Sequence, residues 1–268
     1  MKTARIARFA RMMSAAAATL TLAAGCGSTD DGTSGSAATA AGKGGQTVVV
    51  FAAASLTETF TALGKAFQSA HPGVTVKFNF GGSSALAQQI AQGAPADVFA
   101  AASPATMKTV TDAHLVAGRP TTFVRNRLEI AVPPDNPGKV TALKDLAGAK
   151  LKVVLCAPQV PCGAAAQKAL SAAGLTVNPV SQEQDVRAAL TKVELEEADA
   201  ALVYRTDVKA AAGKVTGIDF PEAAKAINDY PIATLAKAPQ PTLAGQFVQL
   251  VLSGQGKTTL GQAGFESP

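Results

Sequence analysis

The chain has 268 residues, of which 47% are hydrophobic and 16% are charged, so it is long enough and apolar enough to fold as two modest lobes. Its formal charge of +5 arises mostly at its start, where the first 25 residues hold four basic residues and no acidic one. The remainder carries 20 basic against 19 acidic residues, so its net charge gives no indication of a nucleic-acid partner.

Residues 1–25 are typical of an export signal. A basic start precedes an apolar stretch from Ala15 to Ala24, which is too short to span a membrane as a permanent helix. Small residues directly before Cys26 are similar to the lipobox of bacterial lipoproteins, although that motif often has Leu where Ala23 stands; the alternative is an ordinary secretory signal with a chance Cys. Residues 26–46 are nearly all small or polar, and we interpret them as a flexible tether behind a lipidated Cys26.

Strand and helix patterns alternate from residue 47 onward, which predicts an α/β fold with mostly parallel strands. In chain order, strands are expected at 47–51, 74–80, 97–101, 127–132, 151–156, 200–204, 215–220 and 230–236. Helices are expected at 56–67, 84–92, from 104, and at 163–173, 185–196, 241–252 and 258–263.

The last two helices have no strands of their own to cover, so we expect them to pack back on the first part of the fold. The chain would then cross twice between two lobes, near 127–132 and near 230–236. The predicted boundaries are 47–127 plus 232–268 for lobe I and 128–231 for lobe II.

Two early segments share a short strand, a turn of small residues and a helix. The first, 48–56, carries Ser55, and the second, 78–86, carries Ser83 and Ser84. A Ser at the N-cap, together with the free N–H groups of a helix N-terminus, forms a ready anion site. Since neither turn contains Lys or Arg, the pattern predicts a doubly charged oxyanion held by neutral donors.

Two cysteines remain once Cys26 is assigned to a lipid. Cys156 and Cys162 form an even pair in a protein that is expected outside the cytoplasm, which favours a disulfide. A metal site is the alternative, but no His or further Cys lies nearby in the sequence to complete one.

Six motifs in order carry a resemblance to a known family. The chain resembles the ModA-type molybdate-binding proteins of ABC importers, which are class II periplasmic binding proteins, and the resemblance covers residues 46–268. The motifs are VFAAASL at 50–56, SSALAQQI at 83–90, GAPADVF at 93–99, VPCG at 160–163, DVR at 185–187 and LVY at 202–204.

The resemblance implies a two-lobed fold in which each lobe is a mostly parallel sheet flanked by helices, with the ligand in the cleft. It implies that molybdate, and tungstate too, is held through its oxygens, with no cofactor and no directly bound metal. The implied donors are the hydroxyls of Ser55, Ser83 and Tyr204 and the backbone N–H groups of Cys162 and Val186. Ser84 stays open as an alternative to Ser83, since one turn could use either.

The resemblance also implies how the protein works. It would be a monomeric binding protein and not an enzyme. The lipobox-like residues before Cys26 add the expectation that a lipid holds it on the outer face of the cell membrane, and the charge balance adds that it has no nucleic-acid partner. There it would deliver its ligand to an ABC permease.

Other classes of protein fit the sequence less well. A serine hydrolase would carry Gly-x-Ser-x-Gly, whereas Ser55 lies in Ala-Ala-Ser-Leu and neither His has a recognisable acid partner. A cytoplasmic regulator can share the fold but would lack an export signal. Carriers of sulfate, phosphate or iron also share it, and the fold alone does not decide between them.

We expect no cation to touch the anion. Arg205 follows Tyr204 on a strand, so it faces away from the cleft if Tyr204 faces into it. Arg187 follows Val186 in a first helical turn, and it is expected to pair with a surface acid such as Glu183.

Overall fold

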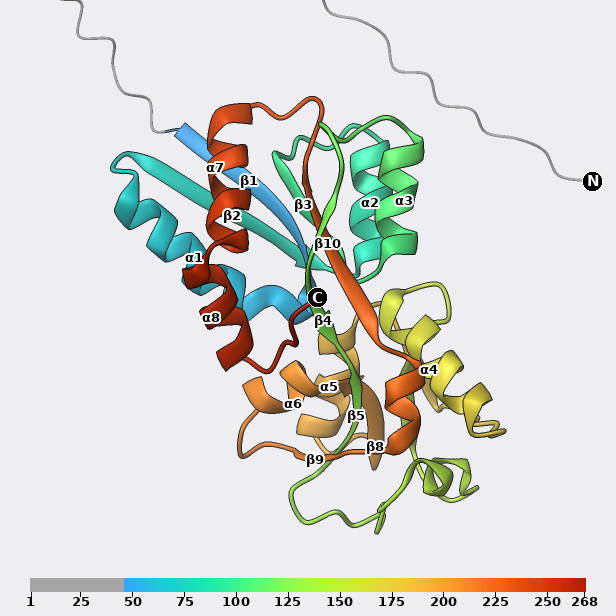
Figure 1. The fold of residues 1–268 in the computed structure, drawn as a ribbon. Helices are drawn as coiled ribbons and strands as arrows, with labels where there is room; N and C mark the ends of the chain where they lie inside the picture. The colour runs from blue at the N-terminus through green and yellow to red at the C-terminus, as the bar shows by residue number, and fades with distance from the viewer. Residues whose placement is uncertain (1–45) are drawn as a thin grey trace, which may run out of the picture. The chain divides into compact units, whose positions relative to one another are not determined.

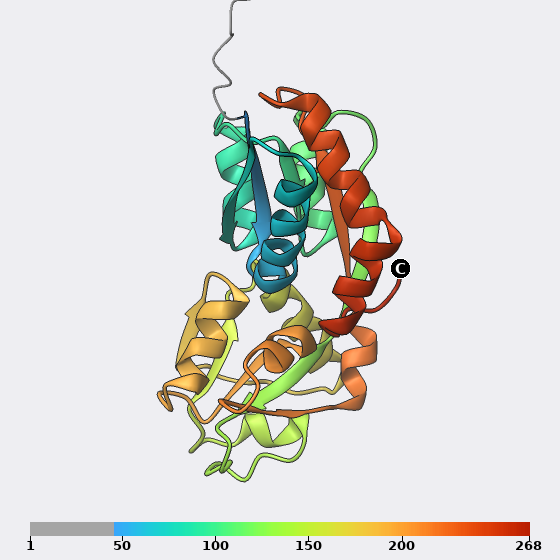
Figure 2. The ribbon, with the colours of Figure 1, turned by 90° about the vertical axis from the view of Figure 1, so that its left-hand side faces the viewer.

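Figure 1 shows the computed structural model of the protein, which describes residues 46–268. These residues form two lobes, each built on a five-stranded sheet flanked by helices (Figures 1 and 2). The predicted two-lobed α/β fold is therefore confirmed. The predicted export signal, the lipid on Cys26 and all but the last residue of the predicted tether lie outside the described residues.

The first lobe is built on the sheet that begins the described chain. In spatial order its strands are β2 (Val74–Gly81), β1 (Gln46–Ala53), β3 (Val98–Ala100), β10 (Asn228–Thr234) and β4 (Thr121–Asn126). Its helices are α1 (Thr57–Ala70), α2 (Ser83–Ala91), α3 (Pro104–Asp112), α7 (Pro241–Leu252) and α8 (Gly254–Gln262). The strand β1 pairs in parallel with β2 and β3, whereas β10 runs antiparallel to both of its neighbours.

The second lobe repeats this plan. In spatial order its strands are β7 (Ser181–Glu183), β6 (Val153–Cys156), β8 (Ala200–Tyr204), β5 (Leu128–Val132) and β9 (Thr216–Ile218). Its helices are α4 (Pro161–Ala172), α5 (Val186–Glu194) and α6 (Arg205–Ala210), with short 3-10 turns at Leu143–Ala147 and Pro221–Lys225. Here β5 is the antiparallel strand, so in each sheet the reversed strand is one that follows a crossing from the other lobe.

The two crossings lie at Arg127 and just before Asn228. The second crossing comes four residues earlier than predicted, because Asn228 already pairs with Asn126 in the first sheet. Residues 228–231, which were expected in lobe II, therefore belong to lobe I.

The last helices do cover the first sheet, as predicted. The ring of Phe247 on α7 packs edge-on against Phe60 and Phe67 of α1, with centroids 5.9 and 5.6 Å apart. On the other face of the sheet, α2 and α3 bury a separate core that includes Leu86 and Met107. Alternation along β1 explains the two cores, since Val50 faces one and Phe51 faces the other.

The first turn of helix α6 contains a buried carboxylate, that of Asp207. Asp207 is 1% exposed, and one carboxylate oxygen accepts the N–H of Tyr204 at 3.0 Å. The other oxygen has no hydrogen-bond partner among the described residues. Burial raises the pKa of Asp207 to about 7, against the opposing effects of that hydrogen bond and of the Arg187 charge.

We predict a pH-dependent stability from Asp207. An unfolded Asp releases its proton near pH 3.9, about three units below the folded group. The contribution of Asp207 to the free energy of unfolding is therefore complete below about pH 3.9. It is lost as the pH rises toward 7, at about 1.4 kcal/mol per pH unit. Asp207→Asn keeps the acceptor and removes the titration, so it should be more stable than wild type at pH 8.

Urea unfolding of both proteins at pH 4, 5, 6, 7 and 8 tests this difference, because other titrating groups contribute equally to the two. The stabilisation by Asn should shrink toward pH 4. A difference that stays constant over this range would show that Asp207 is ionised in the fold.

Candidate functional site

A small cavity lies between the two lobes where several helices begin. Lobe I lines it with the turns 53–55 and 81–83 and with Ala102, and lobe II lines it with 160–162, 185–186 and Tyr204. Its volume is about 20 Å³, which suits a small ion and is too small for a sugar or a nucleotide.

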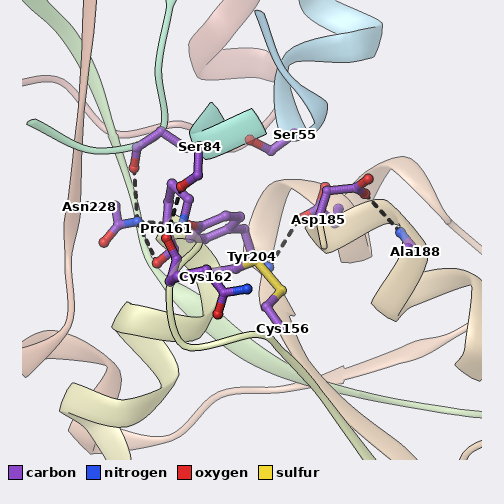
Figure 3. The surroundings of a disulfide bond; sticks show 12 residues. Ser55, Ser84, Cys156, Pro161, Cys162, Asp185, Ala188, Tyr204 and Asn228 are labelled. Carbon is purple, nitrogen blue, oxygen red and sulfur yellow. Dashed lines mark hydrogen bonds between the residues drawn. A yellow bond between two sulfur atoms is a disulfide. The ribbon is translucent and has the colours of Figure 1, made fainter. Parts of the chain in front are cut away.

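The structure brings all five predicted donors to this one cavity. The residues Ser55, Ser83, Cys162, Val186 and Tyr204 all line it, and each is at most 5% exposed. Figure 3 shows Ser55 on the side of lobe I, with Cys162 and Tyr204 on the side of lobe II. Ser84 is directed elsewhere, since its hydroxyl donates to the carbonyl of Gln159 at 2.8 Å. Ser83 rather than Ser84 therefore faces the cavity.

The prediction that Ser55, and either Ser83 or Ser84, are N-caps is wrong. Ser55 lies within a 3-10 turn, Ala54–Leu56, that precedes α1, and Ser83 is the first residue of α2, after the N-cap Gly82. Neither side chain makes a capping bond, because each has a partner from a distant segment. Ser83 Oγ accepts the N–H of Ala102 at 3.0 Å, and Ser55 Oγ lies 2.9 Å from the hydroxyl of Tyr230.

These partners determine what the cavity hydroxyls can do. Asn228 Nδ2 donates to the hydroxyl of Tyr204 at 2.7 Å and to the carbonyl of Ala102 at 2.9 Å. A carbonyl can only accept, so this contact identifies the Asn228 atom as the amide nitrogen. The oxygens of Ser83 and Tyr204 thus each accept from an N–H group, which leaves their own protons free to be donated to a ligand.

A second side-chain amide, that of Asn126, acts on Ser55 through Tyr230. The Asn126 oxygen accepts the N–H of Arg127 at 3.1 Å, so its nitrogen faces Thr206 at 2.8 Å and Tyr230 at 3.4 Å. An N–H directed at the Tyr230 oxygen favours donation from Tyr230 to Ser55, which frees the Ser55 proton for the cavity.

Sequence reasoning missed Asn126, Asn228 and Tyr230. The available signal was position: Asn126 and Asn228 both lie next to a predicted crossing, where a polar side chain becomes buried between lobes. Each is at most 6% exposed, and the two residues are paired across β4 and β10.

Backbone donors come from the starts of α2, α4 and α5, all of which lie at the cavity. The first N–H groups of a helix have no intrahelical partner, and those of Cys162 and Val186 are among them. The Asp185 carboxylate caps α5 by accepting the N–H of Ala188 at 3.0 Å. A disulfide joins Cys156 to Cys162 and ties the end of β6 to the start of α4.

Within residues 46–268 no Lys or Arg lines the cavity, and the nearby Arg205 is paired elsewhere. Arg205 pairs with Glu129 at 2.9 Å and with Asp219 at 2.8 Å. Burial raises the pKa of both Tyr204 and Tyr230, so both phenols stay protonated and remain donors at neutral pH.

Arg187 pairs with a surface acid, as predicted, but that acid is Glu58 and not Glu183. The guanidinium lies 3.0 Å from the carboxylate of Glu58 on α1, across the interface between lobes. The reason is that the first turn of α5 faces α1, whereas Glu183 is engaged by the hydroxyl of Ser181 at 2.8 Å.

Within residues 46–268 no group of three His, Cys, Asp or Glu side chains could hold a metal ion. The helices described there include none that is long and apolar enough to cross a membrane.

Comparison with known proteins agrees with this architecture. The chain matches the model of the bacterial extracellular solute-binding protein family over residues 48–266. It is 46% identical over 243 residues to the molybdate-binding protein ModA of Mycobacterium tuberculosis, covering 91% of this chain and 92% of the relative. It is 34% identical over 201 residues to ModA of Escherichia coli, covering 70% and 77%.

Solved structures that share the fold include two oxyanion-binding proteins. The periplasmic molybdate-binding protein of Azotobacter vinelandii matches with a TM-score of 0.73 at 22% identity, over 82% of this chain and 99% of that one. The sulfate-binding protein SubI of Mycobacterium tuberculosis matches with a TM-score of 0.73 at 19% identity, over 83% and 87%. The chain therefore belongs to the bacterial extracellular solute-binding protein family, and within that family it is related to the molybdate-binding proteins ModA.

Proposed function

We propose that this protein captures molybdate, and tungstate as well, outside the cytoplasm and delivers it to an ABC permease. The observation that carries the proposal is the cavity between the lobes, where the five predicted donors are neutral and come from both lobes. Molybdate at neutral pH is a small tetrahedral dianion whose four oxygens can only accept hydrogen bonds. The donors and this ligand are thus complementary.

The charge of the anion would be offset by dipoles. The positive ends of α2, α4 and α5 face the cavity, and unpaired N–H groups at helix starts bind anions readily. Each hydrogen bond to a charged group contributes about 1.5–3 kcal/mol, so five of them can hold a dianion without a Lys or Arg.

The polarity of the hydroxyls disfavours phosphate. Monohydrogen phosphate carries a proton that needs an acceptor, and the hydroxyls of Ser83 and Tyr204 are poor ones because each already accepts an N–H group. The Asp185 carboxylate also lines the cavity, where it accepts the N–H of Ala188, so this effect lowers the affinity for phosphate without abolishing it. Sulfate has the charge of molybdate but is smaller, and donors held at fixed positions would leave it with stretched hydrogen bonds. Selectivity would therefore come from cavity size and from donor polarity.

Delivery and anchoring rest on the relatives and on the sequence pattern. A Bacillus subtilis relative, 34% identical over 166 residues, is a putative ABC transporter substrate-binding lipoprotein. Small residues before Cys26 and the tether that follows support a lipid anchor on this chain too. We propose that the protein acts as a monomer and needs no cofactor.

The function is tested by calorimetric titration of the protein from residue 27 onward with molybdate, tungstate, sulfate and phosphate at pH 8. Molybdate and tungstate should bind, and sulfate and phosphate should each bind at least about tenfold more weakly, which is about 1.4 kcal/mol. Sulfate or phosphate binding as tightly as molybdate would contradict the proposal.

Removal of the hydroxyl of Ser55 or Ser83 should reduce the free energy of molybdate binding more than it reduces the free energy of unfolding. Ser55→Ala and Ser83→Ala each delete one hydrogen bond to a charged ligand, so affinity should fall by about 1.5–3 kcal/mol, roughly 10- to 150-fold. The matched control is Ser69→Ala, because that hydroxyl donates to the carbonyl of Lys65 on the exposed side of α1.

Calorimetry gives the affinity of each variant and urea unfolding gives its stability. If Ser55→Ala or Ser83→Ala lost stability but kept near-native affinity, that Ser would be a structural residue and not a ligand.

A further inference from the structure

We propose that Glu58, Arg187 and Ser84 form a clasp between the lobes that sets the affinity for the anion without touching it. The proposal rests on the proposed function, since it concerns how firmly the lobes close around the same cavity. None of the three residues lines the cavity, yet each lies within three residues of one that does.

The first contact of the clasp is the ion pair between α1 of lobe I and α5 of lobe II. Glu58 Oε1 lies 3.0 Å from Arg187 Nη2, and the side chains are 47% and 35% exposed. Glu58 follows the turn that carries Ser55, and Arg187 follows Val186 directly. The pair therefore joins the two chain segments that present one proposed donor from each lobe.

The second contact joins a different pair of segments. Ser84, on α2 of lobe I, donates its hydroxyl to the carbonyl of Gln159 in the loop before α4 of lobe II, at 2.8 Å. The neighbouring residues Ser83 and Val160 line the cavity. Adjacent serines thus have separate tasks, since Ser83 faces the cavity and Ser84 bridges the lobes.

The lobes also meet backbone to backbone beside the cavity. A Cβ atom added at Gly82 of lobe I would come 2.2 Å from the carbonyl oxygen of Gln184 in lobe II. Only glycine fits this approach. The clasp therefore operates at a seam where the lobes are already in close contact.

These contacts act on affinity through the closed state. The anion uses donors of both lobes, so it binds fully only when the lobes are closed, and the apparent dissociation constant equals the intrinsic one divided by the closed fraction. A contact that holds the lobes together without the ligand raises that fraction. The clasp residues thus strengthen binding although none of them contacts the anion.

Glu58 makes the proposal sharply testable because two physical effects predict opposite signs. If only long-range charge mattered, removing the negative Glu58 would strengthen the binding of a dianion. If the clasp matters, Glu58→Gln weakens binding by about two- to fivefold, the value expected for a half-exposed ion pair. Ser84→Ala should weaken it by about two- to tenfold.

The control is Asp112→Asn. Asp112 is also an exposed acid of lobe I, but its partner is Lys108 in the same helix, at 2.7 Å, so it joins no lobes. Titration of the four proteins with sodium molybdate should leave this variant unchanged. Tighter or unchanged binding by Glu58→Gln would overturn the clasp.

The role of Arg187 is tested in the Glu58→Gln background. If Arg187 acts through Glu58, adding Arg187→Ala should lower the affinity for molybdate by less than about a further twofold, because the ion pair is already broken. A larger additional loss would show that the guanidinium acts on the anion directly, and would remove Arg187 from the clasp.

A ligand-free measurement separates this proposal from the function itself. Small-angle scattering of the Glu58→Gln, Ser84→Ala double variant should give a larger radius of gyration than Asp112→Asn. This holds whatever anion the wild-type protein binds. Equal radii, with unchanged thermal melting, would overturn the clasp while leaving the proposed function intact.

Discussion

The arrangement of the cavity depends on two buried amides that must find hydrogen-bond partners. Asn126 and Asn228 are paired in register on β4 and β10, where the chain passes between lobes, and an unpaired buried amide is costly. Their N–H groups reach Thr206 and Tyr204 in lobe II and the carbonyl of Ala102 in lobe I. Because these N–H groups can only donate, they also determine which way the hydroxyls of Tyr204 and, through Tyr230, of Ser55 donate. The junction between the lobes and the chemistry of the site are therefore one network.

The fold could be predicted where an element carries its own pattern. Helix α1 repeats Phe60, Leu63 and Phe67 at helical spacing, and the buried strand β8 is a continuous run of apolar residues ending in Tyr204. The strands β4 and β7 escaped prediction because they are edge strands with polar, exposed positions, and they are strands because of their neighbours. Helix α6 is only six residues long and follows β8 without a break, so no period could reveal it.

The same reasoning explains which parts of the site could be predicted. Each of the five predicted donors lies in a short motif that can be read within a few residues, and all of them line the cavity. The errors concern partners that are distant in the sequence. Ser55 meets Tyr230 175 residues later, and Arg187 meets Glu58 in the other lobe. Local rules for N-caps and surface pairs could not anticipate contacts that form only when the lobes come together.

The interleaved course of the chain has a consequence for the order of folding. Lobe II is continuous, from β5 to the turn before β10, whereas the first sheet lacks its fourth strand until Asn228–Thr234 joins it. Helices α7 and α8 then supply one face of its core, including Phe247. A chain that becomes available N-terminus first can therefore complete lobe II before lobe I. The Cys156–Cys162 disulfide lies within lobe II. The N-terminal lobe is the last to close, and until then its apolar strands must stay protected from other chains.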